Sequence, residues 1–106
     1  MRRAKLSQFK GGWWMGAFKP SCLPTRLFEV AHKWHRKGEV WPAHYQRQAV
    51  EYNLLICGRL QIGRHRFAAG DIFVIHPLEV VAPIFLTDCE LTVVKVPSLP
   101  GDKVLC

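Results

Sequence analysis

Apolar and polar residues alternate along most of the chain, and this alternation predicts β-strands. From residue 27 onward, one strand face would carry Phe28, Val30, His32 and Trp34, and the other Glu29, Ala31, Lys33 and His35. Further strands are expected over residues 12–18, 40–46, 50–57, 59–62, 65–67, 72–75, 80–85 and 90–96. Because helix-period patterns are scarce and short strands recur regularly, the pattern predicts an all-β fold.

Glycine and proline interrupt this pattern and mark where strands turn. Gly63 and Arg64 can form a two-residue turn between strands 59–62 and 65–67, and Pro42 indicates an edge position or a bulge. The uninterrupted apolar run 72–75 is typical of a strand buried on both faces. Residues 1–10 are polar and basic and are expected to form a loose N-terminal arm, which leaves residues 11–106 as one domain.

The chain has 106 residues, of which 49% are hydrophobic and 22% charged, enough for one core but not for two domains. Its formal net charge of +7 is compatible with an anionic ligand, nucleic acid or an acidic surface as partner. The basic residues are scattered, and only Arg64-His65-Arg66 and His35-Arg36-Lys37 form clusters. Since no nucleic-acid-binding motif accompanies them, we expect a solvated basic surface rather than nucleic-acid recognition, and among small molecules the charge favours an anionic one.

The cysteines and the apolar segments indicate the compartment. Cys22, Cys57, Cys89 and Cys106 are widely spaced and include no C-x-x-C pair, so neither a zinc site nor a disulfide framework is indicated. No apolar run is long enough to span a bilayer, and the basic start lacks the apolar stretch of a signal peptide. We therefore expect a cytoplasmic protein with reduced thiols and no membrane contact.

The segment from Gly38 to Gly58 holds the most informative spacing. Five residues after Gly38 come His44-Tyr45-Gln46, then Glu51 after four more, then Gly58 after six. Residues 44 and 46 project from one strand face, and a hairpin return would bring Glu51 opposite them. This spacing resembles the first cupin motif, with Gln46 at the position of the family's second histidine. The resemblance implies a single-domain cupin-type jelly-roll β-barrel over residues 11–106.

A second segment resembles only the beginning of the second cupin motif. Residues 70–75 match, but His76 takes the proline position, Leu78 the glycine position, and Val81 the position of the fourth metal ligand. The ending, from Lys95 to Lys103, is similar to that of small single-domain cupins of unassigned function. The metal-binding motifs are therefore degenerate.

The resemblance implies a metal site, since three histidines and one glutamate hold Fe, Mn, Ni or Zn in the family. Here His44, Gln46 and Glu51 remain as candidate metal ligands. Because an amide oxygen is the weaker donor, we expect any divalent metal ion to bind weakly. His76 could substitute if its strand carries it inward; otherwise it is a polar residue at a strand end.

Metal-free chemistry is the other use of these residues. His44 and Glu51 could act as general acid and base for proton abstraction beside a carbonyl, as the resemblance to metal-free sugar-isomerising cupins implies. Alternatively, Glu51 is a buried carboxylate held by His44 or an arginine. The candidate ligand-binding residues are Gln46, His76, Tyr45 and Asn53.

Three functions remain open. The first is a small-molecule-binding or regulatory cupin without conventional dioxygenase activity, because two of the four ligand positions are replaced. The second is an isomerase, epimerase or metal-dependent enzyme acting on a small sugar or carboxylate through His44 and Glu51. The third is an assembly protein, since cupin barrels pair through their sheets; a strand carrying Trp13 and Trp14 suits such a homodimer.

Overall fold

The computed structural model describes all residues from 1 to 106, and nearly all of its regular structure is β-strand. Two short 3₁₀ helices, Leu6–Gln8 and Lys10–Gly12, come before the strands. The strands are β1 Trp13–Met15, β2 Glu29–His35, β3 His44–Gln46, β4 Val50–Cys57, β5 Arg59–Ile62, β6 His65–Ala68, β7 Ile72–Ile75, β8 Ile84–Phe85, β9 Cys89–Val96 and β10 Lys103–Leu105. The all-β prediction is confirmed.

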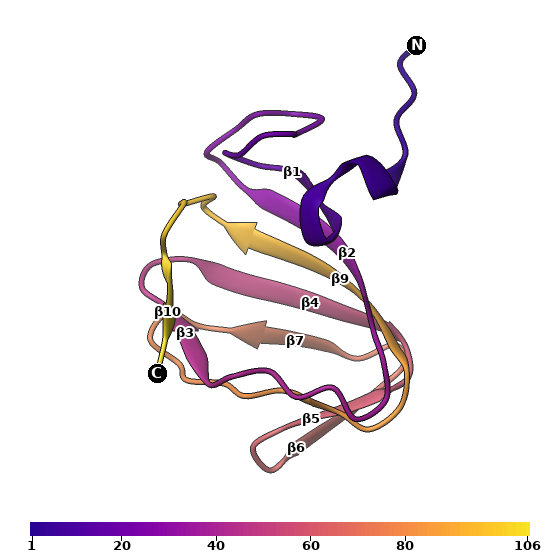
Figure 1. Ribbon diagram of the computed structural model, residues 1–106. Helices are drawn as coiled ribbons and strands as arrows, with labels where there is room; N and C mark the ends of the chain where they lie inside the picture. Colours follow the sequence, from indigo (N-terminus) through magenta and orange to yellow (C-terminus); the bar gives the residue numbers. More distant parts are fainter.

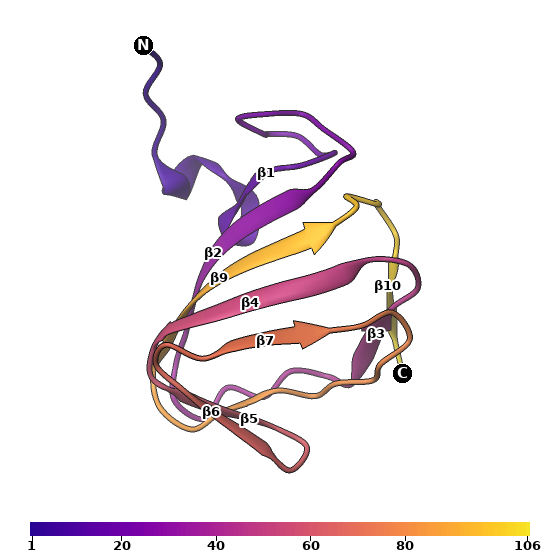
Figure 2. The same cartoon turned by 180° about the vertical axis from the view of Figure 1, so that it is seen from behind.

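The strands form three antiparallel sheets that together make a jelly-roll arrangement. The largest has the order β1-β2-β9-β4-β7, and the smaller two are β10-β3 and β6-β5-β8. The large sheet forms one wall, and the chain crosses back behind it through β3, β10, β5 and β6 to form the other (Figures 1 and 2). The expected barrel is therefore built from facing sheets rather than from one continuously hydrogen-bonded sheet.

The hydrophobic core lies between these walls, on the inward positions of the strands. It consists of Ala31, Leu55, Leu60, Phe85, Cys89, Leu91 and Val93. In β2, the predicted alternation holds: Ala31 is fully buried, whereas Trp34 is 62% exposed. A period of two thus decides which side chains can reach the interior.

Two expectations about individual segments are wrong. The run 72–75 is not buried on both faces, because nothing covers the outer face of the large sheet and Ile72 is 70% exposed. The first strand is shorter than expected, since the chain leaves β1 at Met15 and bends through Gly16. After Val96 the chain forms one further strand that the sequence pattern did not predict, since β10 pairs antiparallel with β3, with Lys103 opposite Gln46 and Leu105 opposite His44.

The N-terminal segment contains a short 3₁₀ turn. Its 3₁₀ turn at Leu6–Gln8 is closed by the Lys5 backbone N–H, which donates to Gln8 Oε1 at 2.7 Å.

No helix in the structure has both the length and the apolarity needed to cross a membrane.

Candidate ligand-binding pocket

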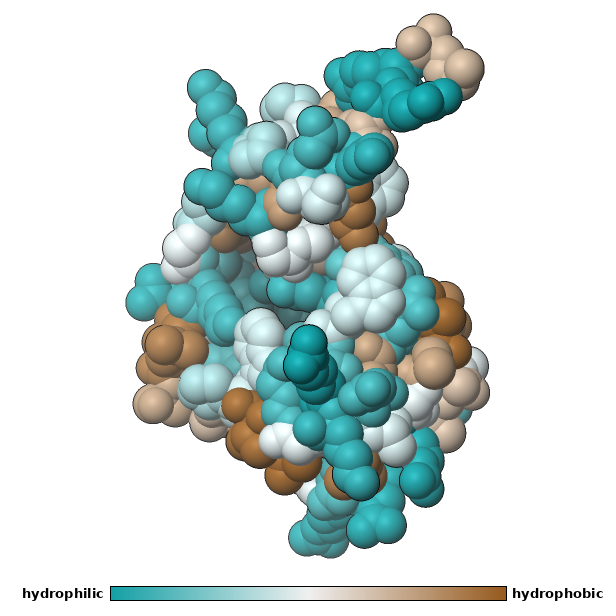
Figure 3. All heavy atoms as spheres, turned by 45° about the vertical axis from the view of Figure 1, so that its right-hand side comes forward, coloured by the Kyte–Doolittle hydropathy of each residue, from teal (hydrophilic) through white to brown (hydrophobic).

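A cavity of about 250 Å³ lies between the large sheet and the two smaller ones. Part of its wall is apolar and is formed by Leu60, Ile62, Phe73, Phe85, Leu91 and Val93. The polar end contains His44, Gln46, Glu51, Lys95 and Lys103, and the side chains of Lys33 and Asn53, whose strand positions are opposite Leu91 and Phe73, also line the cavity. The space-filling view shows a hollow on this face of the molecule with hydrophilic side chains along its rim (Figure 3).

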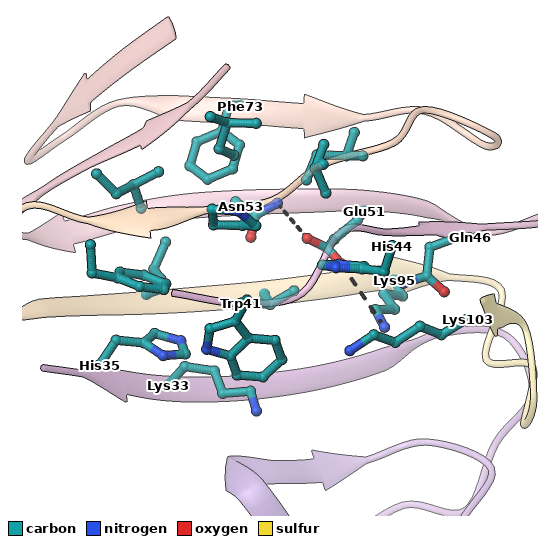
Figure 4. Close-up of a pocket in the computed structure, with 18 of the residues that line it drawn as sticks. Lys33, His35, Trp41, His44, Gln46, Glu51, Asn53, Phe73, Lys95 and Lys103 are labelled. Atoms are coloured by element: carbon teal, nitrogen blue, oxygen red, sulfur yellow. Dashed lines mark hydrogen bonds and ion pairs between the residues drawn. The ribbon is translucent and has the colours of Figure 1, made fainter. Parts of the chain in front are cut away.

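The first-motif residues meet in this cavity. His44 and Gln46 reach it from β3, and Glu51 and Asn53 from β4, each pair being two positions apart on one strand face (Figure 4). His44, Gln46 and Asn53 are 7%, 3% and 5% exposed. The cavity therefore holds four of the six residues that the sequence nominated.

Tyr45 and His76 do not line the cavity. Tyr45 lies between His44 and Gln46 in β3, so the alternation turns it to the opposite face. His76 comes directly after the end of β7 and is exposed, with its backbone N–H donating to Glu79 Oε1 at 3.0 Å. Since His76 is not carried inward, it cannot substitute as a ligand in this cavity.

Val81 occupies the place that the second motif assigns to a ligand. It lines the cavity, is 5% exposed, and forms an antiparallel bridge with His44. The degenerate motif therefore keeps its geometry but presents an apolar side chain there.

His44 has a defined tautomer. Its Nδ1 lies 2.8 Å from the carbonyl oxygen of Pro42, which can only accept a hydrogen bond. Nδ1 therefore carries the proton, and in the neutral ring Nε2 keeps a lone pair. This arrangement leaves a basic nitrogen on a buried side chain at the cavity wall.

Glu51 has two polar partners. Asn53 Nδ2 donates to its Oε2 at 3.1 Å, and Lys95 Nζ lies 3.9 Å from its Oε1 (Figure 4). Glu51 and Lys95 are directly opposite in the β4–β9 register, so the sheet itself brings them together. The sequence allowed for a carboxylate held by His44 or an arginine, but the partner is a lysine.

Three lysines converge on the polar end, from different strands: Lys33 from β2, Lys95 from β9 and Lys103 from β10. Their ammonium groups lie over two indole rings. Lys33 is 5.6 Å from the Trp13 centroid and 5.5 Å from that of Trp41, Lys95 is 4.9 Å from Trp13, and Lys103 is 4.8 Å from Trp41. Contacts with aromatic faces partly replace the water that these cations lose.

Burial and the neighbouring positive charges both lower the pKa of two of these lysines. Burial lowers the pKa of Lys33, and the positive charges of Lys103 and Lys95 lower it further, against the opposing effect of Glu39 and Glu51. Burial likewise lowers the pKa of Lys103, with a contribution from Lys95 that Glu51 opposes. Three lysines against the two carboxylates of Glu29 and Glu51 give this part of the lining an excess of positive charge.

Trp41 is held in place by a small network beside the cavity. Its Nε1 donates to Glu39 Oε2 at 2.8 Å, and the same carboxylate oxygen contacts His35 Nδ1. His35 stacks on Phe85 with ring centroids 4.0 Å apart. The hydrogen bond from Trp41, together with His35, lowers the pKa of Glu39 despite partial desolvation. This network fixes one wall of the cavity.

The residues present do not fit a metal ion. No group of three or more His, Cys, Asp and Glu side chains comes together in the structure. His44 and Glu51 are the strong donors in the cavity, Val81 offers none, and the ammonium group next to Glu51 would repel a cation. The cavity is therefore not suited to hold a metal ion.

Comparisons with known proteins identify the fold of this chain. No family model matches the sequence, and no curated protein matches it significantly. An uncharacterised protein with a double-stranded β-helix domain from Klebsiella pneumoniae aligns over 100% of this chain and 97% of its own, with a TM-score of 0.69 and 17% identity. An RmlC-like cupin from Shewanella frigidimarina aligns over 71% and 70%, with a TM-score of 0.64 and 15% identity. The fold is that of a small cupin.

A third structural match is Pac13, a nucleoside dehydratase, which has also been solved from Streptomyces with uridine. It covers 76% of this chain and 69% of its own chain, with a TM-score of 0.67 and 10% identity. At these identities the likeness concerns the fold alone. It does not assign the metal ligands or reactions of cupins to this chain.

The sequence did contain a signal for two of the three lysines. Lys33 and Lys95 each stand at an inward position of a strand whose neighbouring inward residues are apolar, namely Ala31 and Val93. An isolated charge in that phase must face the interior. Lys103 had no such signal, because the strand that carries it exists only through its pairing with β3.

Proposed function

We propose that this cupin binds a small organic molecule in the cavity between its sheets. The observation that carries the proposal is the division of the cavity into an apolar end and a polar end, which is typical of ligand sites. Gln46 is 3% exposed, and its side-chain amide has no hydrogen-bond partner in the protein, so it is free to bind a ligand. The solved structure of a cupin-fold relative with uridine supports a small molecule as occupant.

Filling the apolar end tests this proposal. Ile62 lines the cavity, so Ile62→Trp is expected to weaken every ligand bound there by at least about 10-fold through steric exclusion. The matched control is Ile84→Trp in the adjacent strand β8, where the isoleucine is 40% exposed and lies outside the cavity. The measurement is ligand-observed NMR with a panel of single-ring fragments, both neutral and charged. If no fragment binds, or if both variants bind alike, the proposal is wrong.

A second candidate function is proton transfer by His44 and Glu51, as in an isomerase or epimerase. It is favoured by the Nε2 lone pair that the Pro42 contact leaves on His44. Running the same panel in D₂O, with carbonyl compounds included, would show deuterium entering beside the carbonyl group. Loss of that exchange in His44→Gln would assign it to the site.

We also propose that the protein forms a homodimer through the outer face of the large sheet. This face has an apolar centre formed by Tyr52, Leu54, Ile72, Val74 and Val94. On a chain with 15 Lys and Arg residues, none of the outward positions of β2, β4, β7 or β9 holds either type. A second copy can therefore approach this face without repulsion between like charges.

The dimer proposal is tested by sedimentation velocity. Leu54 lies between Ile72 and Thr92 in the sheet register, so Leu54→Lys places a charge in the centre of the face and is expected to weaken dimerisation by at least about 10-fold. Val80→Lys is the control, because Val80 is 57% exposed in the loop between β7 and β8. A wild-type protein that stays monomeric at high concentration would contradict the proposal.

A further inference from the structure

The lining of the cavity contains three lysines and two carboxylates, so its polar end is positively charged. Of Lys33, Lys95 and Lys103, only Lys95 has a carboxylate oxygen within 4.0 Å, and that contact with Glu51 is 3.9 Å long. Glu29, the other carboxylate at the cavity wall, accepts a hydrogen bond from Ser98 Oγ at 3.0 Å. Two ammonium groups are thus left with indole faces and no anion.

The fold holds these groups in place from three sides. Lys103 is opposite Gln46 in the β10–β3 pair, Lys95 is opposite Glu51 in the β9–β4 pair, and Lys33 reaches in from β2. Figure 4 shows Lys95 and Lys103 together next to Gln46, and Lys33 extending beneath Trp41. Because each lysine sits on a different strand, the cluster is a product of the tertiary fold.

Such a cluster is unfavourable without a counter-ion. Partly buried like charges repel, and contact with an indole face compensates only part of the desolvation. The lowered pKa of both Lys33 and Lys103, caused first by burial and then by neighbouring lysines, expresses this cost. An anion among the three ammonium groups would remove the repulsion and gain charge-assisted hydrogen bonds.

From this geometry we propose that the ligand is an oxyanion, a carboxylate or phosphate on a short carbon body, with its charged end held by Lys33, Lys95 and Lys103. The side-chain amide of Gln46 lies beside them as an uncharged donor. The apolar body would extend toward Phe73 and Phe85 at the other end. This inference rests on the proposed function, because it names the chemical class of the ligand for that same cavity.

The test uses three probes with the same ring: benzoate, phenyl phosphate and the neutral benzamide. Isothermal titration is expected to give affinities for at least one of the anions that exceed that for benzamide by at least about 10-fold. The preference is expected to shrink as chloride is added, since salt screens the attraction. The stronger of the two anions identifies carboxylate or phosphate as the preferred group.

The variants Lys33→Met and Lys103→Met are each expected to reduce anion affinity by at least about 10-fold and to leave benzamide binding unchanged. Neither variant should lower the melting temperature, because methionine removes a partly buried like charge and keeps the apolar stem. Lys37→Met is the matched control, since Lys37 is exposed in the turn after β2. It should bind like the wild type.

The outcomes separate this inference from the proposed function. If benzamide binds as tightly as the anions, or if the Lys33 and Lys103 variants keep full anion affinity, the oxyanion inference is overturned and the pocket remains. If none of the three probes binds, the proposed pocket fails and the oxyanion inference fails with it.

Discussion

Gly58→Ala is expected to destabilise the protein by about 3–5 kcal/mol, a large share of the stability of a domain of this size. Gly58 joins β4 to β5 with φ +97°, a conformation that residues with a Cβ rarely adopt. A Cβ there would lie 2.2 Å from the carbonyl oxygen of Asp88 and 2.8 Å from Cys89 Sγ. The connection before β9 would therefore have to move away from the start of β5.

Gly38 provides the control within the same sequence motif. Its φ is +84°, but a Cβ added there would meet nothing within 4 Å. Gly38→Ala is therefore expected to cost only the backbone strain, about 1–2 kcal/mol. Urea unfolding followed by circular dichroism measures both. Equal losses for the two variants would show that the close approach at Gly58 has no energetic weight.

Asp102→Ala is expected to cost about 3–4 kcal/mol, because it removes the acceptor for two backbone N–H groups at once. The Asp102 carboxylate, on a residue 7% exposed, accepts from Gln48 N at 3.0 Å and from Ala49 N at 2.9 Å. The backbone of Asp102 also accepts from Arg47 N at 3.0 Å. This contact fastens the C-terminal segment to the turn between β3 and β4.

Two variants define the outcome. Asp102→Asn keeps one acceptor oxygen and is expected to lose about half as much stability as Asp102→Ala. Asp88→Ala is the control, because it removes a single hydrogen bond, from Lys37 N at 2.8 Å, at an exposed site. Since β10 begins at Lys103, loosening this contact should also weaken oxyanion binding. Thermal unfolding of all three variants provides the test. A loss for Asp102→Ala no larger than that for Asp88→Ala would contradict the assigned role.

The two proposals about the cavity are consistent with the partial match of the chain to the first cupin motif. The strands still bring residues 44, 46, 51 and 81 to one place, but Gln46 and Val81 are not histidines, and Lys95 lies beside Glu51. A site that surrounds a cation with neutral imidazoles needs electron-pair donors. A site that receives an anion needs N–H donors and positive charge. Three lysines and a free amide meet the second requirement.

The sequence by itself determined most of the strands and which of their side chains share a face. The period of two placed Ala31 and Lys33 on one side of β2, and the spacing from Gly38 to Gly58 correctly brought His44, Gln46 and Glu51 into one cavity. These features are local, because alternation and hairpin return depend on residues that are close along the chain.

Only the tertiary structure decided what that cavity contains. Lys33, Lys95 and Lys103 lie far apart in sequence, and their meeting depends on the register of β9 with β4 and on the pairing of β10 with β3. The same pairing turns a tail rich in proline and glycine into a strand, because the hydrogen bonds of β3 outweigh its weak local preference. Likewise, the exposure of Ile72 depends on the absence of a covering layer over the large sheet, which no local pattern encodes.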